Sequence, residues 1–345
     1  MRSPYELTRG ELAELIPGEA SYRVDQIWRG LWDDASPIGE ITTIPKALRA
    51  RLAGTLGSTL RVLEDVESDH GATRKWVFAL EDGATIETVL MTYADRVTVC
   101  VSTQAGCAMG CSFCATGQAG FTRQLGVGEV LDQVMFAARH AAPRRLSNVV
   151  FMGMGEPLAN YDVTVKALRA LHESRKLSAR HLTVSTVGVA PAIERLAREG
   201  LPLTLAVSLH AANDELRSEI VPLNRRYPLA RLAEACEYWT STTGRRLSFE
   251  WALIEDVNDT DECARELASY ARPLRAHVNL IPLNPTPGYL ARGTSPERVR
   301  EFAALLESLG ANVTVRNTRG RSIDAACGQL ARVTDGKRRR IPVRS

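Results

Sequence analysis

The chain has 345 residues, which suits one large α/β domain with a smaller appendage, because domains commonly run about 100–200 residues and barrels are larger. Hydrophobic residues make up 45%, charged residues 24% and aromatic residues 6%, which excludes a disordered, collagenous or low-complexity chain. The 43 basic and 40 acidic side chains give a net charge of +3, which permits an anionic partner without requiring one.

The chain carries no sequence signal for a membrane or for export. No apolar run approaches the ~20 residues that cross a bilayer, and the start, Met1–Leu7, lacks the apolar core of a signal peptide. We therefore expect a cytoplasmic protein without membrane association. In a reducing compartment the seven cysteines are candidates for metal or redox chemistry and are not expected to form structural disulfides.

Two small regions precede the main part of the chain. Residues 1–58 carry helical patterns over 4–15, 21–34 and 44–56, which predict a helical accessory domain. Residues 59–92 change to period two: Lys75–Leu80 and Thr85–Met91 flank a turn that contains Asp82-Gly83, which favours a hairpin. We expect this β-hairpin to link the two halves of the chain.

From residue 93 to 331, apolar strand-like runs alternate with amphipathic helices, as in repeated βα units with parallel strands. The predicted strands are 97–104, 147–153, 181–186, 203–209, 247–253, 276–282 and 311–316. The predicted helices are 127–140, 161–172, 189–198, 228–240, 260–271 and 295–309. Periodicity leaves open a doubly wound sheet or a full or partial (β/α) TIM-type barrel, and in either fold ligands collect at the carboxyl ends of the strands. The basic tail, 332–345, is expected to be solvated.

A cysteine cluster is the densest chemical signal. Cys107, Cys111 and Cys114 follow the first strand of the βα region, in a glycine-rich loop. A structural zinc site normally closes with four ligands, but the nearest further cysteine, Cys100, lies in a strand that holds it away, and the segment has no histidine. The spacing suits a [4Fe–4S] cluster that keeps one iron free of protein sulfur. A zinc site remains the alternative.

Polar residues recur at the carboxyl ends of later predicted strands. Gly155 and Glu156 end the second strand within Met-Gly-Met-Gly-Glu-Pro, where glycines permit close backbone approach and a carboxylate can accept from an ammonium. The others are Ser185, Ser208, Leu209, His210 and Asn284. Each alone is more often a capping or turn residue, but together they form a ring around one mouth.

The cysteine motif resembles that of the radical S-adenosylmethionine (SAM) superfamily. Five further motifs, in order, resemble the RlmN/Cfr family of RNA adenine methyltransferases, and the likeness runs from about residue 20 to 331. They are Ile86–Val89, Cys100–Cys107, Gly117–Phe121, Val207–Ala211 and Asp324–Leu330. The resemblance implies a radical SAM barrel, a [4Fe–4S] cluster on Cys107, Cys111 and Cys114, and SAM held by Gly155, Glu156 and the strand-end residues named above.

The same resemblance assigns three catalytic residues. Cys327 matches the cysteine that is first methylated and then carries the methylene radical to adenine C2, an atom that is not nucleophilic. Cys100 matches the thiol that releases the covalent RNA adduct through a transient disulfide with Cys327. Glu87 matches the general base that removes the ring proton. Without the family, the two cysteines would be read as core residues and Glu87 as solvent-facing.

The substrate and partners are also implied by the resemblance. They are an adenosine in the peptidyl-transferase region of 23S rRNA, the adenosine beside the anticodon of some tRNAs, and a flavodoxin or ferredoxin as electron donor to a monomeric enzyme. Six basic residues could grip phosphates or merely form a solvated face: Arg23, Arg29, Arg49, Arg51, Arg74 and Lys75. Two alternatives remain: a Cfr-like C8-adenine methyltransferase, and a non-catalytic, zinc-stabilised RNA-binding protein.

Overall fold

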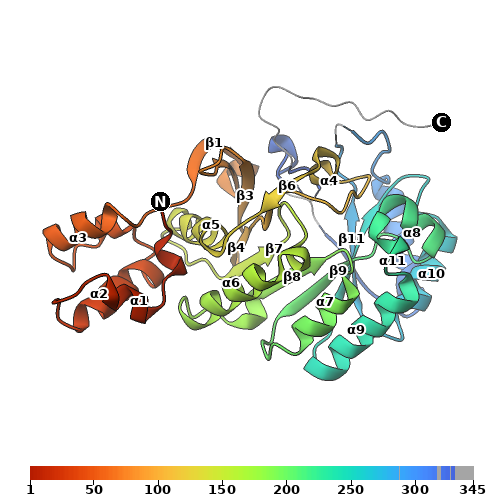
Figure 1. The fold of residues 1–345 in the computed structure, drawn as a ribbon. Coiled ribbons are helices and arrows are strands. Elements are labelled where there is room, and N and C mark those ends of the chain that lie inside the picture. The colour runs from red at the N-terminus through yellow and green to blue at the C-terminus, as the bar shows by residue number, and fades with distance from the viewer. Residues whose placement is uncertain (287, 317–319, 327, 331–345) are drawn as a thin grey trace.

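A single mixed β-sheet organises the chain. The computed structural model describes residues 1–345 apart from 287, 317–319, 327 and 331–345, and its sheet runs in the order β1-β2-β3-β4-β7-β8-β9-β10-β11-β12 (Figure 1). The strands are β1 (Arg61–Ser68), β2 (Thr73–Ala79), β3 (Thr85–Thr92), β4 (Val97–Cys100), β7 (Asn148–Phe151), β8 (Leu182–Thr186), β9 (Thr204–Ser208), β10 (Ser248–Leu253), β11 (His277–Pro282) and β12 (Asn312–Val315). A separate two-stranded sheet pairs β5 (Gln104–Gly106) with β6 (Phe121–Gln124).

From β4 to β12 every neighbouring pair of strands in the main sheet is parallel. These strands follow one another in chain order, without the reversal of a doubly wound sheet. Within the described residues, β12 pairs with β11 alone and β1 with β2 alone, so the curved sheet does not close. The fold is therefore a partial (β/α) barrel, one of the architectures that the sequence left open.

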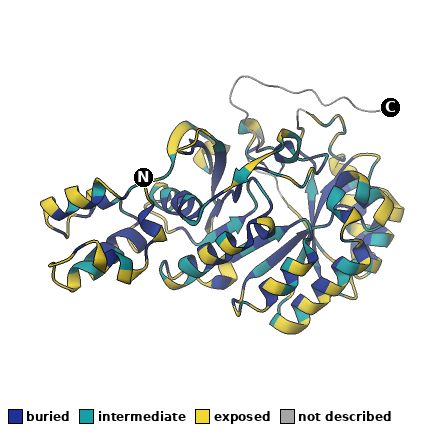
Figure 2. Ribbon diagram, in the orientation of Figure 1, coloured by how far each residue is buried: buried dark blue, intermediate teal, exposed yellow. Residues whose placement is uncertain are grey.

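Helices cover the outside of this barrel. They are α5 (Val127–His140), α6 (Tyr161–Glu173), α7 (Ala190–Ala197), α9 (Leu229–Thr243), α10 (Asp261–Ala271) and α11 (Pro296–Ser308), with the short α4 (Ala115–Ala119) and α8 (Asp214–Ile220) in loops at the carboxyl ends of strands. Each of the longer helices buries the side that faces the sheet and exposes the other, as amphipathic periodicity requires (Figure 2). None of the helices in the described ranges is long and apolar enough to cross a membrane.

The predicted strands and helices are confirmed to within a few residues, with two kinds of difference. The sequence did not resolve the short elements β5, β6, α4 and α8, which have too few residues to show a period. The hairpin of β2 and β3 is confirmed, but it is not a free link between halves. It gains β1 on one edge and pairs through β3 with β4 on the other, so it continues the barrel sheet.

The N-terminal helices pack against α5 and α6. They are α1 (Arg9–Glu14), α2 (Tyr22–Trp32) and α3 (Lys46–Ala53), with the 3₁₀ turns η1 (Pro4–Glu6) and η2 (Ile38–Glu40), and their apolar side chains share one core cluster with the barrel. The carboxylate of Asp132 on α5 accepts from the Ser3 hydroxyl at 3.0 Å and from the Thr59 amide and hydroxyl at 2.7 Å each. Burial raises the pKa of Asp132 to about 6.

This buried carboxylate predicts a pH dependence of stability. Its folded-state pKa of about 6 exceeds the ordinary 3.8, so folding takes up a proton and stability falls as the pH rises from about 4 to 6. Relative to Asp132→Asn, which cannot ionise, wild type should lose roughly 3 kcal/mol of unfolding free energy over that window, measured by urea titration at each pH. Asp95→Asn, at an exposed position, is the control. If wild type differed from Asp95→Asn with the same pH dependence as it differs from Asp132→Asn, the role of Asp132 would be contradicted.

Candidate active site

The three cysteines of the motif occupy the loop between β5 and α4. The backbone amide of Cys107 donates to the Gly120 carbonyl at 2.9 Å, and that of Cys114 donates to the Cys111 carbonyl at 3.2 Å, which folds the loop back on itself. Burial raises the pKa of Cys107 to about 12, and the nearby Cys114 adds to the shift. Burial raises the pKa of Cys111 still further, with both other thiols contributing. The three sulfur groups therefore lie within electrostatic reach of one another.

This donor set, three thiolates in one loop, fits an iron–sulfur cluster. A [4Fe–4S] cluster binds each thiolate at a separate corner, so its three cysteines are spaced around a cube. Cys107, Cys111 and Cys114 would hold the cluster, which leaves one iron open for a non-protein ligand.

The Gly-Met-Gly-Glu-Pro segment after β7 runs against the cluster side of the sheet. A Cβ added at Gly153 would lie 2.7 Å from the carbonyl carbon and oxygen of Val101. One added at Gly155, whose φ is +102°, would lie 2.5 Å from Cβ of Gln104. Only glycine allows this close approach. The segment thus forms a backbone-lined edge beside the cluster loop, which is the kind of surface that can hold the amino-acid end of SAM.

Glu156 is buried beside the cysteines. Its two carboxylate oxygens accept from the backbone amides of Leu158 and Val187, each at 2.9 Å. Burial raises the pKa of Glu156 to about 7, and these hydrogen bonds oppose the shift. The carboxylate therefore joins the loops that follow β7 and β8. Each oxygen can accept a further hydrogen bond, so a role toward a ligand ammonium is compatible with this structural one.

The strand-end residues differ in what they present. Ser185 on β8 and Ser208 on β9 are half-buried, and their hydroxyl oxygens lie 3.5 Å apart. Asn284, which follows β11, is buried. Leu209 is fully buried in the apolar core, so its side chain packs and only its backbone remains for a ligand. The structure thus brings the serines together and assigns Leu209 a packing role that the sequence pattern did not predict.

His210 is a neutral, rigidly held imidazole. Its Nδ1 accepts from the backbone amide of Ala252 at 2.9 Å, and its ring meets Phe113 edge-on at 4.6 Å between centroids. Burial, with a smaller effect of the Arg217 charge, lowers the pKa of His210 to about 3. Phe113 lies between Cys111 and Cys114, so His210 packs directly against the cluster loop.

Arg217 on α8 is a buried cation that the sequence analysis missed. Its guanidinium donates to the carbonyl oxygens of Val187, Leu209 and Ser208 at 2.7, 3.0 and 3.3 Å, and to Oδ1 of Asn224 at 2.8 Å. It therefore ties together the carboxyl ends of β8 and β9. The burial of Arg217 could not be predicted from the sequence, because α8 has too few residues to show which of its sides faces the core.

The C-terminal segment returns over the cluster loop. The Ala115 amide donates to the Gly328 carbonyl at 2.7 Å, and the Thr116 hydroxyl donates to the Leu330 carbonyl. The blue C-terminal segment accordingly lies beside α4 at the carboxyl ends of the strands (Figure 1). Cys327 lies outside the described residues, but the residues after it are fixed next to the cluster motif.

The other two predicted catalytic residues lie on the adjoining hairpin sheet. Glu87 on β3 is buried, and its Oε2 lies 3.2 Å from Nζ of Lys75. Cys100 on β4 is buried and lies opposite Val89 of β3. Neither alternative for Lys75, a contact with RNA phosphate or a solvated face, fits this ammonium, which is buried in an ion pair.

The other basic residues considered as phosphate contacts, all arginines, differ in their exposure and in their partners. Arg74 is bound by the Asp65 carboxylate at 2.6 Å, and Arg23 donates to Gln26 at 2.7 Å. Arg29 and Arg51 on the N-terminal helices are exposed. Arg49 is half-buried, and its guanidinium donates to the Ile41 carbonyl at 3.5 Å. Of these five arginines, the exposed pair Arg29 and Arg51 still suits contact with an anionic partner.

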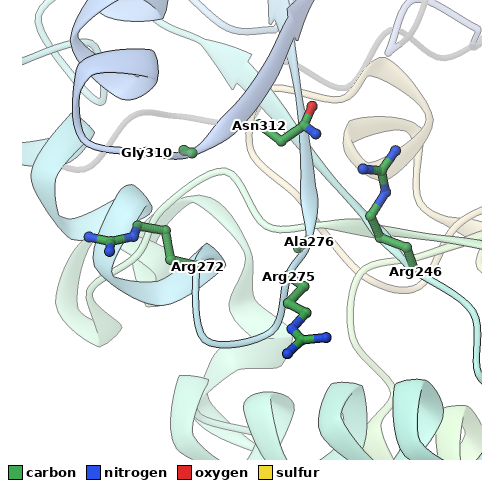
Figure 3. A pocket seen from close by; sticks show the side chains of 7 residues that line it. Arg246, Arg272, Arg275, Ala276, Gly310 and Asn312 are labelled. Carbon is green, nitrogen blue, oxygen red and sulfur yellow. The ribbon is translucent and has the colours of Figure 1, made fainter.

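A basic hollow of about 440 Å³ lies elsewhere on the molecule (Figure 3). Arg246, Arg272 and Arg275 surround it, together with Ala276 and Asn312 at the starts of β11 and β12. These are the amino ends of the strands. The hollow is thus at the opposite end of the barrel from the cysteine loop and is not part of the candidate active site.

Comparison with known proteins agrees with this site. A model of the radical SAM superfamily matches residues 101–268. A chain named "Probable dual-specificity RNA methyltransferase RlmN" from Frankia alni is 50% identical over 353 aligned positions, covering 97% of this chain and 84% of that one. A chain of the same name from Chloroflexus aurantiacus is 49% identical, covering 96% and 93%.

A solved structure matches over nearly the whole fold. The crystal structure of a radical SAM methyltransferase from Sphaerobacter thermophilus superposes with a TM-score of 0.92 at 50% identity, covering 96% of this chain and 99% of that one. Fold, cysteine loop and these matches define a radical SAM enzyme, whose cofactors are a [4Fe–4S] cluster and SAM. More particularly, the chain belongs to the RlmN family of RNA methyltransferases.

The Arg217 network predicts a large effect of a single substitution. Arg217→Met removes the donor from several buried carbonyls at once, and each unsatisfied acceptor costs about 1–3 kcal/mol. We expect a loss of about 2–4 kcal/mol in the free energy of unfolding and weaker SAM binding, measured by denaturant titration and equilibrium dialysis. Arg265→Met, at an exposed position of α10, is the matched control. Equal stability of the two variants would contradict the tie between β8 and β9.

Proposed function

We propose that this enzyme methylates C2 of adenine in RNA through a methylated Cys327 and a covalent enzyme–RNA intermediate. The observation that carries the proposal is the return of the C-terminal segment. Backbone contacts on one side of Cys327 reach the cluster loop through Gly328, and on the other side the Asp324 carbonyl accepts from Lys75, next to Glu87, at 3.2 Å. Residues on either side of the predicted carrier thus contact the cluster loop and the ion-pair partner of the predicted base, although these segments lie far apart in the sequence.

The chain's own residues divide the reaction among them. A cluster held by Cys107, Cys111 and Cys114 would, with SAM, supply a 5′-deoxyadenosyl radical, and Cys327 would carry the methyl group that gives up a hydrogen atom to it. The Cys327 methylene then adds to adenine C2. The radical adduct then loses one electron to a one-electron acceptor, which the oxidised cluster would supply, and the Glu87 carboxylate accepts the C2 proton. The Cys100 thiolate next attacks the Cys327 sulfur: the Cys100–Cys327 disulfide forms, the bond between the sulfur and the methylene carbon breaks, and that carbon takes up a proton to become the methyl group of the released RNA. A radical route is required because an amidine carbon does not attack a sulfonium methyl group.

The substrates, partners and domain roles follow from the same proposal. We take residues 93–331 as the catalytic core, 1–58 as an RNA-binding accessory, 59–92 as the hairpin that supplies Glu87, and 332–345 as a basic tail. The RNA substrates are 23S rRNA and tRNA, in which a base must be unstacked or lie in a loop to enter a buried site. The enzyme acts as a cytoplasmic monomer and receives electrons from a flavodoxin or ferredoxin.

Two cysteine substitutions test the assigned roles. Cys327→Ala should abolish methyl transfer while the iron content stays normal, because the carrier is lost and the cluster ligands remain. Cys100→Ala should accumulate RNA bound covalently to protein, visible as a shifted band on a denaturing gel. Cys263→Ala, at a buried position on α10, is the matched control. Normal turnover by Cys100→Ala would contradict the role of Cys100 in release.

The position of the methyl group is tested separately. Nucleoside mass spectrometry of RNA methylated by the wild-type enzyme that finds only 8-methyladenosine would contradict the C2 product.

Metal content separates this enzyme from a zinc-stabilised RNA-binding protein. Anaerobic reconstitution should give a brown protein with about four irons per chain, as one [4Fe–4S] cluster requires. Cys111→Ser should lose that iron, since a three-cysteine site cannot spare a ligand. Stoichiometric zinc without iron in the wild-type protein would overturn the radical mechanism.

A further inference from the structure

Lys75 is a buried charged side chain that the proposed reaction does not yet use. It lies on β2 with 8% of its surface exposed. An ammonium in such a place costs free energy unless it is paired and hydrogen-bonded. Lys75 meets both conditions: its Nζ lies 3.2 Å from Oε2 of Glu87 and donates to the carbonyl oxygen of Asp324, also at 3.2 Å. One ammonium thus contacts the predicted base and the turn that precedes the methyl carrier.

The sheet register places this lysine on the reactive face. Lys75 of β2 and Cys100 of β4 both lie opposite Val89 of β3, and Glu87 is two residues from Val89 on the same strand. Because alternate residues of a strand project to opposite faces, Lys75, Glu87 and Cys100 share one face. The other face packs on α5, where Thr88 donates to Gln133 at 2.8 Å. The three polar groups are therefore gathered by β-pairing.

A second contact fixes the far end of the same turn. Oδ2 of Asp69 accepts from the Thr73 hydroxyl at 2.6 Å and from the Gly320 amide at 3.0 Å. The Ala325 amide in turn donates to the Gly320 carbonyl at 2.9 Å, which closes the turn on itself. The segment that leads into Cys327 is therefore held to β2 at two places, and Lys75 supplies the one nearer the carrier.

We infer that Lys75 is a positioning residue for RNA methylation: it keeps Glu87 ionised and aimed, and it holds the turn that ends three residues before Cys327. The inference rests on the proposed roles of Glu87 and Cys327. Within the described residues, the Lys75 ammonium forms an ion pair with Glu87, the titratable Cys100 shares its face of the sheet, and the acidic Asp69 and Asp324 lie on the segments that contact β2. An opposite charge this close favours the ionised carboxylate by about one to three pH units.

The sign of the expected pH effect follows from that charge. Glu87 accepts a proton only when it is ionised, so activity requires a pH above the one at which the carboxylate titrates. Removal of the ammonium moves that titration to higher pH. The acid limb of the rate profile should therefore move upward by about one unit or more in Lys75→Met, and the rate near the foot of that limb should fall about tenfold per unit.

The experiment uses the reconstituted full-length enzyme and an RNA fragment that the wild type methylates. Single-turnover rates are measured from pH 6 to 9.5 for wild type, Lys75→Met, Lys75→Arg and the exposed control Lys166→Met. Lys75→Met should show the displaced acid limb with partial recovery at high pH, and should accumulate covalent RNA adduct. Lys75→Arg keeps the positive charge, so the acid limb of its pH–rate profile should stay at the wild-type position while its maximal rate falls. Iron content should stay at the wild-type level, because Lys75 is not among the three cysteines that would hold the cluster.

Other outcomes overturn the inference. Wild-type rates in Lys75→Met, or a uniform loss at every pH with an unmoved limb, would show that Lys75 has no effect on Glu87. If Lys75→Met does not fold, Lys75→Arg still tests the inference. This variant keeps the positive charge, so an acid limb displaced by about one pH unit from that of wild type would contradict the role of the charge. In the Glu87→Gln background, Lys75→Met should no longer displace the acid limb, because no carboxylate is left to titrate at that position; a displacement as large as in Lys75→Met alone would show that Lys75 acts on another group. Failure of the wild type to methylate RNA would instead reject the proposed function.

Discussion

The open edge of the barrel is the constraint on which the site depends. Because β12 and the hairpin strand β1 each have one partner in the described sheet, the parallel strands curve without closing. The returning C-terminal segment contacts both the cluster loop, through Gly328, and the hairpin, through Asp324. Gly328 and Leu330 therefore lie beside a motif more than two hundred residues earlier in the chain.

Buried charges at this end of the barrel are each satisfied, and each connects two segments. Arg217 bridges the ends of β8 and β9, Glu156 bridges the loops after β7 and β8, and Lys75 bridges the hairpin to the C-terminal turn. Burial of a charge is costly, so these contacts contribute less to net stability than to a defined geometry. A radical reaction needs such geometry, since the site must hold the reacting atoms in place and exclude water.

Much of the candidate site could be predicted from the sequence, and the reason is local. The cysteine spacing, the Gly-Met-Gly-Glu-Pro segment and the strand-end serines are short motifs whose placement after strands follows from hydrophobic periodicity. Other parts could not be predicted. Arg217 looks like any surface arginine, the sequence leaves open whether Lys75 contacts phosphate or faces solvent, and it does not show that the Leu209 side chain packs in the core. Burial of each is decided by a neighbour from another part of the chain.

The sequence by itself determined the βα succession, the strand and helix bounds to within a few residues, the cysteine loop and the family. These depend on periodicity and motif spacing, which are properties of consecutive residues. Only the tertiary structure decided that the barrel stays open, that the hairpin extends its sheet, and that Lys75 lies between Glu87 and Asp324. Those features arise from pairing between distant segments. Whether a lysine ammonium is buried depends on the segment that packs over it, and its neighbours in the chain do not determine that segment.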